Sequence, residues 1–167
     1  MNLYKFLVIM TFSLTSCASG AQSVKAPIFK LTLKTLLSHS VNEIGAQNVQ
    51  LSENAFLLDT REQSEFDVSN IKGAIHVGYD HFDMKSVQDI PKDAKVLLYC
   101  SVGYRSEKIG ERMIKEGWTE ISNLYGGIFE WKNIGNSVVD STGIETERVH
   151  AFDQIWGRFL HNGEKVY

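Results

Sequence analysis

The most constraining feature of the sequence is an apolar run that leads into a cysteine-containing loop and then a helical pattern. Residues 96–99 (Val-Leu-Leu-Tyr) are apolar enough for a buried strand, and residues 107–116 are charged with apolar residues at helical spacing. Cys100 takes the first loop position, and Gly103 lets the backbone turn without a Cβ clash. Because a helix N-terminus carries free N–H groups and a positive dipole end, such a loop can hold a sulfur anion.

Short apolar runs and helical patterns alternate along most of the chain. Strands are expected at 55–58, 74–77, 96–99 and 121–124, and helices at 32–40, 62–68, 107–116 and 127–133. This alternation predicts an α/β fold with a central parallel sheet and helices on both faces. Ligands of such sheets bind beyond the carboxyl ends of the strands. Asp59 and Cys100 each follow a predicted strand, so we expect them at one edge of the sheet.

Four segments stand at predicted strand or helix boundaries in a fixed order. They are residues 57–62 (Leu-Leu-Asp-Thr-Arg-Glu), 71–75 (Ile-Lys-Gly-Ala-Ile), 100–106 (Cys-Ser-Val-Gly-Tyr-Arg-Ser) and 123–131 (Asn-Leu-Tyr-Gly-Gly-Ile-Phe-Glu-Trp). Together with Glu65-Phe66 they resemble the rhodanese (sulfurtransferase) family over about residues 56–132. The resemblance implies a single rhodanese-like domain, which we assign to residues 28–135.

The resemblance also implies covalent catalysis by Cys100. The thiolate is expected to take sulfane sulfur from thiosulfate or a persulfide donor, and to pass it from a Cys100 persulfide to a thiol or cyanide. The residues expected to bind the persulfide are Ser101, Val102, Gly103, Tyr104 and Arg105, and those expected to support the loop are Asp59, Arg61 and Ser106. Arg105 has two interpretations, because a guanidinium can meet an anionic substrate or clamp Asp59 or another carboxylate.

Other functions remain open at this point. A persulfide carrier without turnover, or a partner-binding module at the cell envelope, would use the same loop. A cysteine-dependent phosphatase or arsenate reductase has a similar loop with five residues between cysteine and arginine, whereas four separate Cys100 from Arg105 here. The alternative without a chemical role is that Cys100 is simply a small buried apolar residue, as free cysteines often are.

Composition narrows the list of partners. The formal net charge is −3, and nucleic-acid binders usually show a clustered basic surface, so we expect no nucleic acid. No His, Cys and carboxylate pattern has the spacing of metal ligands, so we expect neither a metal nor a cofactor. The expected partners are a small sulfur donor and a thiol acceptor. The sequence assigns no protein partner.

Residues 1–16 are expected to be a lipoprotein signal peptide. Phe6 to Leu14 form an apolar run too short to span a bilayer, and small residues precede Cys17. An ordinary signal peptide with a chance cysteine is the alternative. We expect a lipid on Cys17 and a flexible tether within residues 17–27. The protein would then be anchored in the cell envelope facing the periplasm, and Ala18, by resemblance to lipoprotein sorting, favours the outer membrane.

Residues 136–167 lie beyond the resemblance. We expect them to form a C-terminal extension packed on the domain, with an amphipathic helix over residues 152–160. A patch that faces a partner or a membrane is the alternative for this helix. Residues 42–54 contain Gly45 and show no clear period, so we expect them to be irregular.

Overall fold

The computed structural model describes residues 26–50 and 54–167. The predicted signal peptide, Cys17 and nearly all of the predicted tether therefore lie outside the described residues. No helix in the described ranges is long and apolar enough to cross a bilayer.

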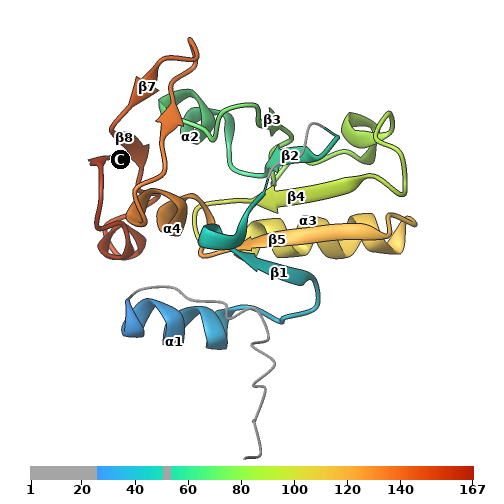
Figure 1. Ribbon diagram of the computed structural model, residues 1–167, viewed down its shortest axis with the longest axis horizontal. Helices are drawn as coiled ribbons and strands as arrows, with labels where there is room; N and C mark the ends of the chain where they lie inside the picture. Colours follow the sequence, from blue (N-terminus) through green and yellow to red (C-terminus); the bar gives the residue numbers. More distant parts are fainter. Residues whose placement is uncertain (1–25, 51–53) are drawn as a thin grey trace, which may run out of the picture.

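A five-stranded parallel sheet in the order β1-β5-β4-β2-β3 forms the centre of the fold (Figure 1). Its strands are β1 (Asn42–Gly45), β2 (Phe56–Asp59), β3 (Ile75–His76), β4 (Lys95–Tyr99) and β5 (Glu120–Tyr125). The strand that leads to Cys100 lies in the middle of the sheet. The predicted α/β fold with a central parallel sheet is confirmed.

The two faces of the sheet have separate cores, because successive side chains of a strand point to opposite faces. On one face Leu57 and Leu97 pack with residues of α1 (Pro27–Leu36) and α4 (Gly127–Asn133). On the other face Leu58 and Leu98 pack with residues of α3 (Tyr104–Lys115) and of the segment 77–90. The sheet is thus covered on both sides.

The remaining elements are short. They are the helix α2 (Gln63–Val68), the 3-10 helices η1 (Ala46–Asn48), η2 (Met84–Val87) and η3 (Trp156–Phe159), and the strands β6 (Val138–Val139), β7 (Glu145–Thr146), β8 (Arg148–His150) and β9 (Glu164–Val166). Strands β6 and β7 pair antiparallel, and β8 and β9 pair parallel, in two small sheets.

Three predicted boundaries near the sheet are wrong. Residues 42–45 form β1 rather than an irregular segment. This strand was not predicted because it lies at the sheet edge, where polar side chains such as Asn42 and Glu43 are common. The first helix covers 27–36 rather than 32–40, since a proline at its first position starts it early. Helix α3 begins at Tyr104, directly after the left-handed Gly103 (φ 115°), so Arg105 is helical.

The predicted helix over residues 152–160 is also wrong. Phe152 has a left-handed backbone (φ 65°), which an α-helix does not admit. Asp153 Oδ1 accepts the N–H groups of Ile155 and Trp156, each at 2.8 Å, and only the 3-10 turn η3 follows. The apolar residues whose spacing suggested a helix lie in a tight turn instead.

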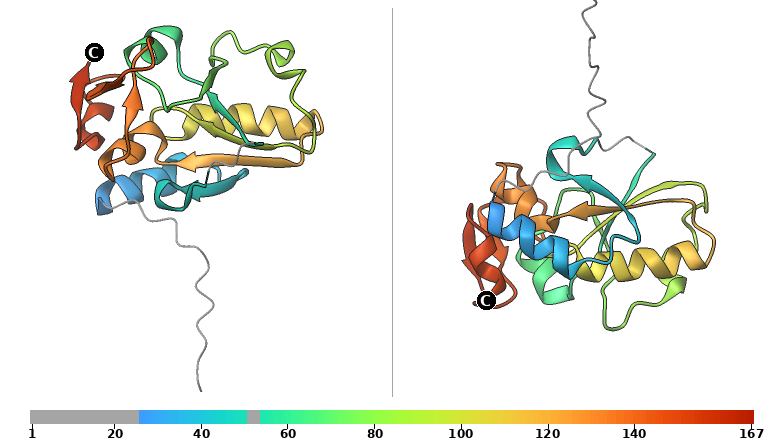
Figure 2. Two further views of the ribbon diagram at one scale, coloured as in Figure 1. Left: turned by 45° about the horizontal axis from the view of Figure 1, so that its top comes forward. Right: turned by 90° about the horizontal axis from the view of Figure 1, so that it is seen from below.

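The C-terminal extension shares the core that contains α1 and α4. Val149, Ala151 and Leu160 are fully buried in that core, and the Phe159 ring stacks on Phe29 of α1 with 4.7 Å between centroids. Figure 2 shows the extension, in red, beside α1, in blue, in both views.

Asn133, the last residue of α4, fixes the extension by three hydrogen bonds. Its Nδ2 donates to the Phe159 carbonyl (2.8 Å), and its Oδ1 accepts the N–H groups of His161 (2.7 Å) and Asn162 (3.2 Å). The Asn133 side chain thus connects the end of α4 to the C-terminal extension.

We predict that Asn133→Ala lowers the free energy of unfolding by about 1–3 kcal/mol, because three backbone groups of the extension lose their partner. Amide hydrogen exchange should accelerate at residues 159–162. The control is Asn136→Ala, since Asn136 bonds to Trp131 through its backbone N–H rather than its side chain. Equal stability of the two variants would contradict the bridging role of Asn133.

Candidate active site at the Cys100 loop

Cys100 is the first residue after the central strand β4. Its neighbour Tyr99 stands opposite Asp59 of β2 in the parallel register, so Cys100 and Asp59 share one edge of the sheet as predicted. The Gly103 N–H donates to the Cys100 Sγ (3.1 Å). The residue is 1% exposed, and its side chain forms part of the floor of a cavity.

The loop is held from behind by α4. The Cys100 and Ser101 carbonyls accept the N–H groups of Ile128 (2.9 Å) and Phe129 (3.2 Å). A Cβ at Gly127 (φ 56°) would overlap the Cys100 carbonyl oxygen, so this close approach requires glycine. With these two carbonyls turned toward α4, the opposite side of the loop faces the thiol, and the Gly103 N–H points to the sulfur.

Asn123 joins the loop to the first turn of α3. Its Nδ2 donates to the Gly103 carbonyl (2.9 Å), and its Oδ1 accepts the Ser106 hydroxyl (2.7 Å). Ser106 therefore touches the loop through Asn123. Asn123 is the first residue of the motif at 123–131, and its contacts with the loop were not predicted from the sequence.

Arg105 clamps a carboxylate, and that carboxylate is Glu65 rather than Asp59. Its Nη1 and Nη2 lie 2.6 and 2.8 Å from the two Glu65 oxygens, and Nη2 also donates to Ser101 Oγ (2.9 Å). The Ser101 hydroxyl in turn donates to Glu65 (3.0 Å). The three side chains form one closed network beside the thiol.

The network keeps Glu65 ionised. Burial raises the pKa of this carboxyl, but the hydrogen bond and charge of Arg105 outweigh burial, and the pKa falls to about 2. Burial alone lowers the pKa of Arg105, yet Glu65 raises it above its ordinary value. The pair is therefore fully charged at neutral pH.

Asp59 and Arg61 form a second, fully buried ion pair below the edge of the sheet. Arg61 Nη2 lies 2.6 Å from Asp59 Oδ2 and also donates to the Ser69 carbonyl (2.7 Å). The pair ties the end of β2 to the turn after α2. Neither residue lines the cavity, so any support they give to the Cys100 loop acts through neighbouring backbone.

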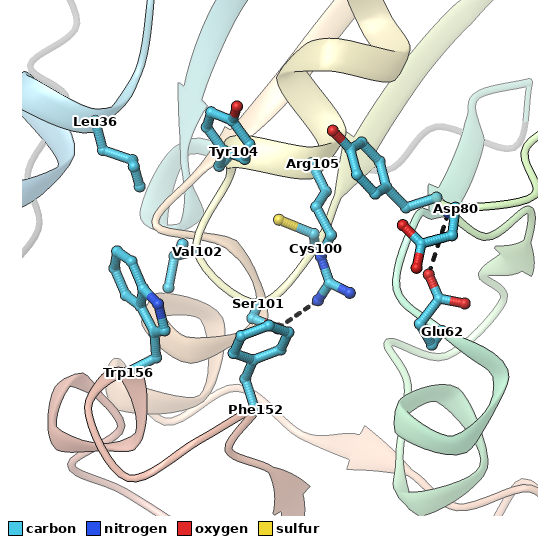
Figure 3. Close-up of a pocket in the computed structure, with 11 residues that line it drawn as sticks. Leu36, Glu62, Asp80, Cys100, Ser101, Val102, Tyr104, Arg105, Phe152 and Trp156 are labelled. Carbon is cyan, nitrogen blue, oxygen red and sulfur yellow. Dashed lines mark hydrogen bonds between the residues drawn. The ribbon is translucent and has the colours of Figure 1, made fainter.

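The cavity above Cys100 has a volume of about 430 Å³ (Figure 3). The predicted loop contributes five of its residues, namely Cys100, Ser101, Val102, Tyr104 and Arg105, whereas Gly103 does not line it. Residues not predicted from the sequence complete the wall, namely Leu36, Glu62, Tyr79, Asp80, Phe152 and Trp156. No group of three or more His, Cys, Asp or Glu side chains among residues 26–50 and 54–167 is placed to hold a metal ion.

The low pKa of Glu65 predicts a pH-dependent contribution to stability. Its pKa falls from an ordinary 4.5 to about 2, so this contribution is complete above pH 4.5 and is lost as the pH falls toward 2. We expect Glu65→Gln to lower the free energy of unfolding by about 2–3 kcal/mol at neutral pH, since it leaves Arg105 without its counter-charge.

Denaturant unfolding at a series of pH values would test this prediction. The difference between wild type and Glu65→Gln should shrink as the pH falls below about 4.5. The control is Glu116→Gln, because Glu116 is an exposed residue at the end of α3. A difference that stays constant over this pH range would exclude the ion pair as its cause.

Comparisons with known proteins agree with this geometry. A family model described as "Rhodanese-like domain" matches residues 41–134. The tRNA uridine(34) hydroxylases of Streptococcus sanguinis and Bacillus cereus are 32% identical over 88 residues and 33% identical over 81 residues. These matches cover 47% and 46% of this chain and 25% of each relative. The chain thus spans about a quarter of the length of these relatives.

Solved structures share the fold. The BH2092 protein of Bacillus halodurans superposes with a TM-score of 0.55 at 17% identity, over 70% of this chain and 86% of that one. Protein hp1203 of Helicobacter pylori gives a TM-score of 0.51 at 26% identity, over 60% and 91% of the two chains. The family match spans more than half of the sequence and contains the whole Cys100 loop, so the chain belongs to the rhodanese-like domain family.

Proposed function

We propose that the protein is a sulfurtransferase that carries sulfane sulfur as a persulfide on Cys100. The observation that carries this proposal is the Cys100 Sγ at the floor of a cavity, with the Gly103 N–H directed at it from 3.1 Å. The next N–H groups, of Tyr104 and Arg105, belong to the first turn of α3 and have no acceptor within the helix. Such donors favour a sulfur anion at this position.

The reaction has two displacement steps. The Cys100 thiolate attacks the sulfane sulfur of thiosulfate, the S–S bond breaks, and sulfite leaves with the electron pair. With an organic persulfide as donor, the corresponding thiolate leaves instead. A thiol acceptor or cyanide then attacks the outer sulfur of the Cys100 persulfide, which releases a new persulfide or thiocyanate and restores the thiolate.

Arg105 supports sulfur chemistry over phosphate chemistry. Its guanidinium is held by Glu65 and Ser101, whereas phosphate binding would need it free to face the substrate. Four residues rather than five separate it from Cys100, and the shorter loop leaves less room for a phosphoryl group. The reaction that names the curated relatives is not carried over, because the chain spans only a quarter of their length.

Intact mass of the full chain tests the proposal. After thiosulfate or a persulfide donor we expect a gain of one sulfur, about 32 Da, and its loss after excess cyanide or thiol. Cys100→Ser should abolish the gain and leave the fold unchanged by circular dichroism. Cys17→Ser is the matched control, since it removes the other cysteine and should load sulfur like the wild type.

The outcomes separate the competing functions. Thiocyanate or persulfide that accumulates over many cycles supports an enzyme. One sulfur that loads and is never released to the acceptor indicates a carrier. A mass that stays unchanged, in protein with a free Cys100 thiol, contradicts the proposal and favours a partner-binding module.

We further propose that a lipid on Cys17 anchors the protein to the outer membrane, where it faces the periplasm. The short apolar run and the small residues before Cys17 support this location. Protein from the membrane fraction of a bacterial host should lack residues 1–16 and carry the mass of acyl chains. The Cys17→Ser variant should keep residues 1–16. A wild-type protein without acyl chains would refute the anchor.

A further inference from the structure

Part of the cavity wall comes from segments outside the family match of residues 41–134. Phe152 and Trp156 of the C-terminal extension lie on one side of the cavity, and Leu36 of α1 lies across from Trp156 (Figure 3). The apolar surface that they form continues onto Val102 and Tyr104 of the loop. The thiol therefore opens into a largely apolar and aromatic space.

The backbone N–H groups of both aromatic residues of the extension are held by side-chain acceptors. Phe152 has φ 65°, an uncommon conformation for a bulky residue, and its N–H donates to His150 Nδ1 (3.1 Å). The Asp153 carboxylate accepts the backbone N–H of Trp156 (2.8 Å). The Trp156 ring contacts the Phe159 ring with 5.9 Å between centroids. Backbone strain of this kind clusters at functional sites.

Phe152 stays 47% exposed despite this constraint. Its ring covers the Arg105 guanidinium, with 5.1 Å between the guanidinium carbon and the ring centroid. A ligand in the cavity would remove part of this apolar ring from water, which favours an apolar ligand group.

The charges around the cavity disfavour a small dianion. Among the described residues that line it, Arg105 is the one Lys or Arg, and both of its terminal nitrogens already bond to Glu65. Glu62 and Asp80, on the side of the cavity away from Leu36 and Trp156, add two further carboxylates (Figure 3). Thiosulfate would approach these carboxylates without a free cation to compensate for the repulsion.

We propose that Phe152 and Trp156 make the cavity selective for sulfur donors with an apolar organic group and at most one negative charge, over the dianion thiosulfate. This inference rests on the sulfurtransferase function proposed above. The volume of about 430 Å³ suits a small organic molecule, and thiosulfate would leave most of it to water.

Three donors that deliver the same sulfur separate the effects of charge and ring. Benzenethiosulfonate and methanethiosulfonate each carry one negative charge and differ only in the organic group, whereas thiosulfate carries two charges. In each case the Cys100 thiolate attacks the terminal sulfur, the S–S bond breaks, and the sulfinate or sulfite leaves with the electron pair. The product on Cys100 is the same persulfide, so loading rates of the full chain compare directly.

We expect the wild type to load from benzenethiosulfonate about tenfold faster than from methanethiosulfonate, and slowest from thiosulfate, as second-order rate constants. Phe152→Ala and Trp156→Ala should each bring the ratio of the two thiosulfonates close to one, with methanethiosulfonate loading within about twofold of wild type. Ile155→Ala is the matched control, because Ile155 is an exposed residue of the same turn that does not line the cavity.

The result tests the donor selectivity separately from the proposed sulfurtransferase function. Loading with equal rate constants for the two thiosulfonates in the wild type, or a preference that survives both aromatic substitutions, would overturn the selectivity and leave the sulfurtransferase function intact. Thiosulfate as the fastest donor would also overturn it. No loading of Cys100 from any of the three donors would overturn the sulfurtransferase function itself, and the inference with it.

Discussion

The backbone contact between the Cys100 loop and the N-terminus of α4 determines where the thiol lies. Two loop carbonyls are bound by α4, and the absence of a side chain at Gly127 allows the two backbones to meet. Because β4 and β5 are neighbours, the loop after one strand and the helix after the other emerge side by side. The sheet order thus creates the contact, and the contact leaves the Gly103 N–H directed at the sulfur.

A charged network and an apolar wall divide the surroundings of that thiol. Arg105, Glu65 and Ser101 satisfy one another, so they stabilise the loop without leaving a free cation at the site. The Gly103 N–H and the N-terminus of α3 favour a sulfur anion at Cys100, and the charge of Arg105 adds to this. On the other side, Phe152 and Trp156 line the cavity. Under the proposed function, sulfur transfer and donor recognition are tasks of different segments of the chain.

The sequence predicted the features that depend on local patterns. The β4 strand, the Cys100 loop and α4 all follow from apolar runs and glycines close together in the chain. Glu65 lies in the segment that resembles the family, but its pairing with Arg105 was not predicted, because 40 positions separate the two residues and no short pattern joins them. The turn at Phe152 was misread as a helix, since apolar spacing carries no information about a left-handed backbone. Its place over Arg105 depends on tertiary packing of the extension.

The burial of Cys100 also bears on its fate among other thiols. A disulfide requires two sulfurs about 2 Å apart and Cα atoms within about 7 Å of each other. A cysteine that is 1% exposed at the floor of a cavity cannot reach such a position against the same residue of a second copy. Covalent dimers through Cys100 are therefore sterically barred, while slender sulfur compounds retain access. The depth of the site thus limits disulfide formation by Cys100 to small thiols.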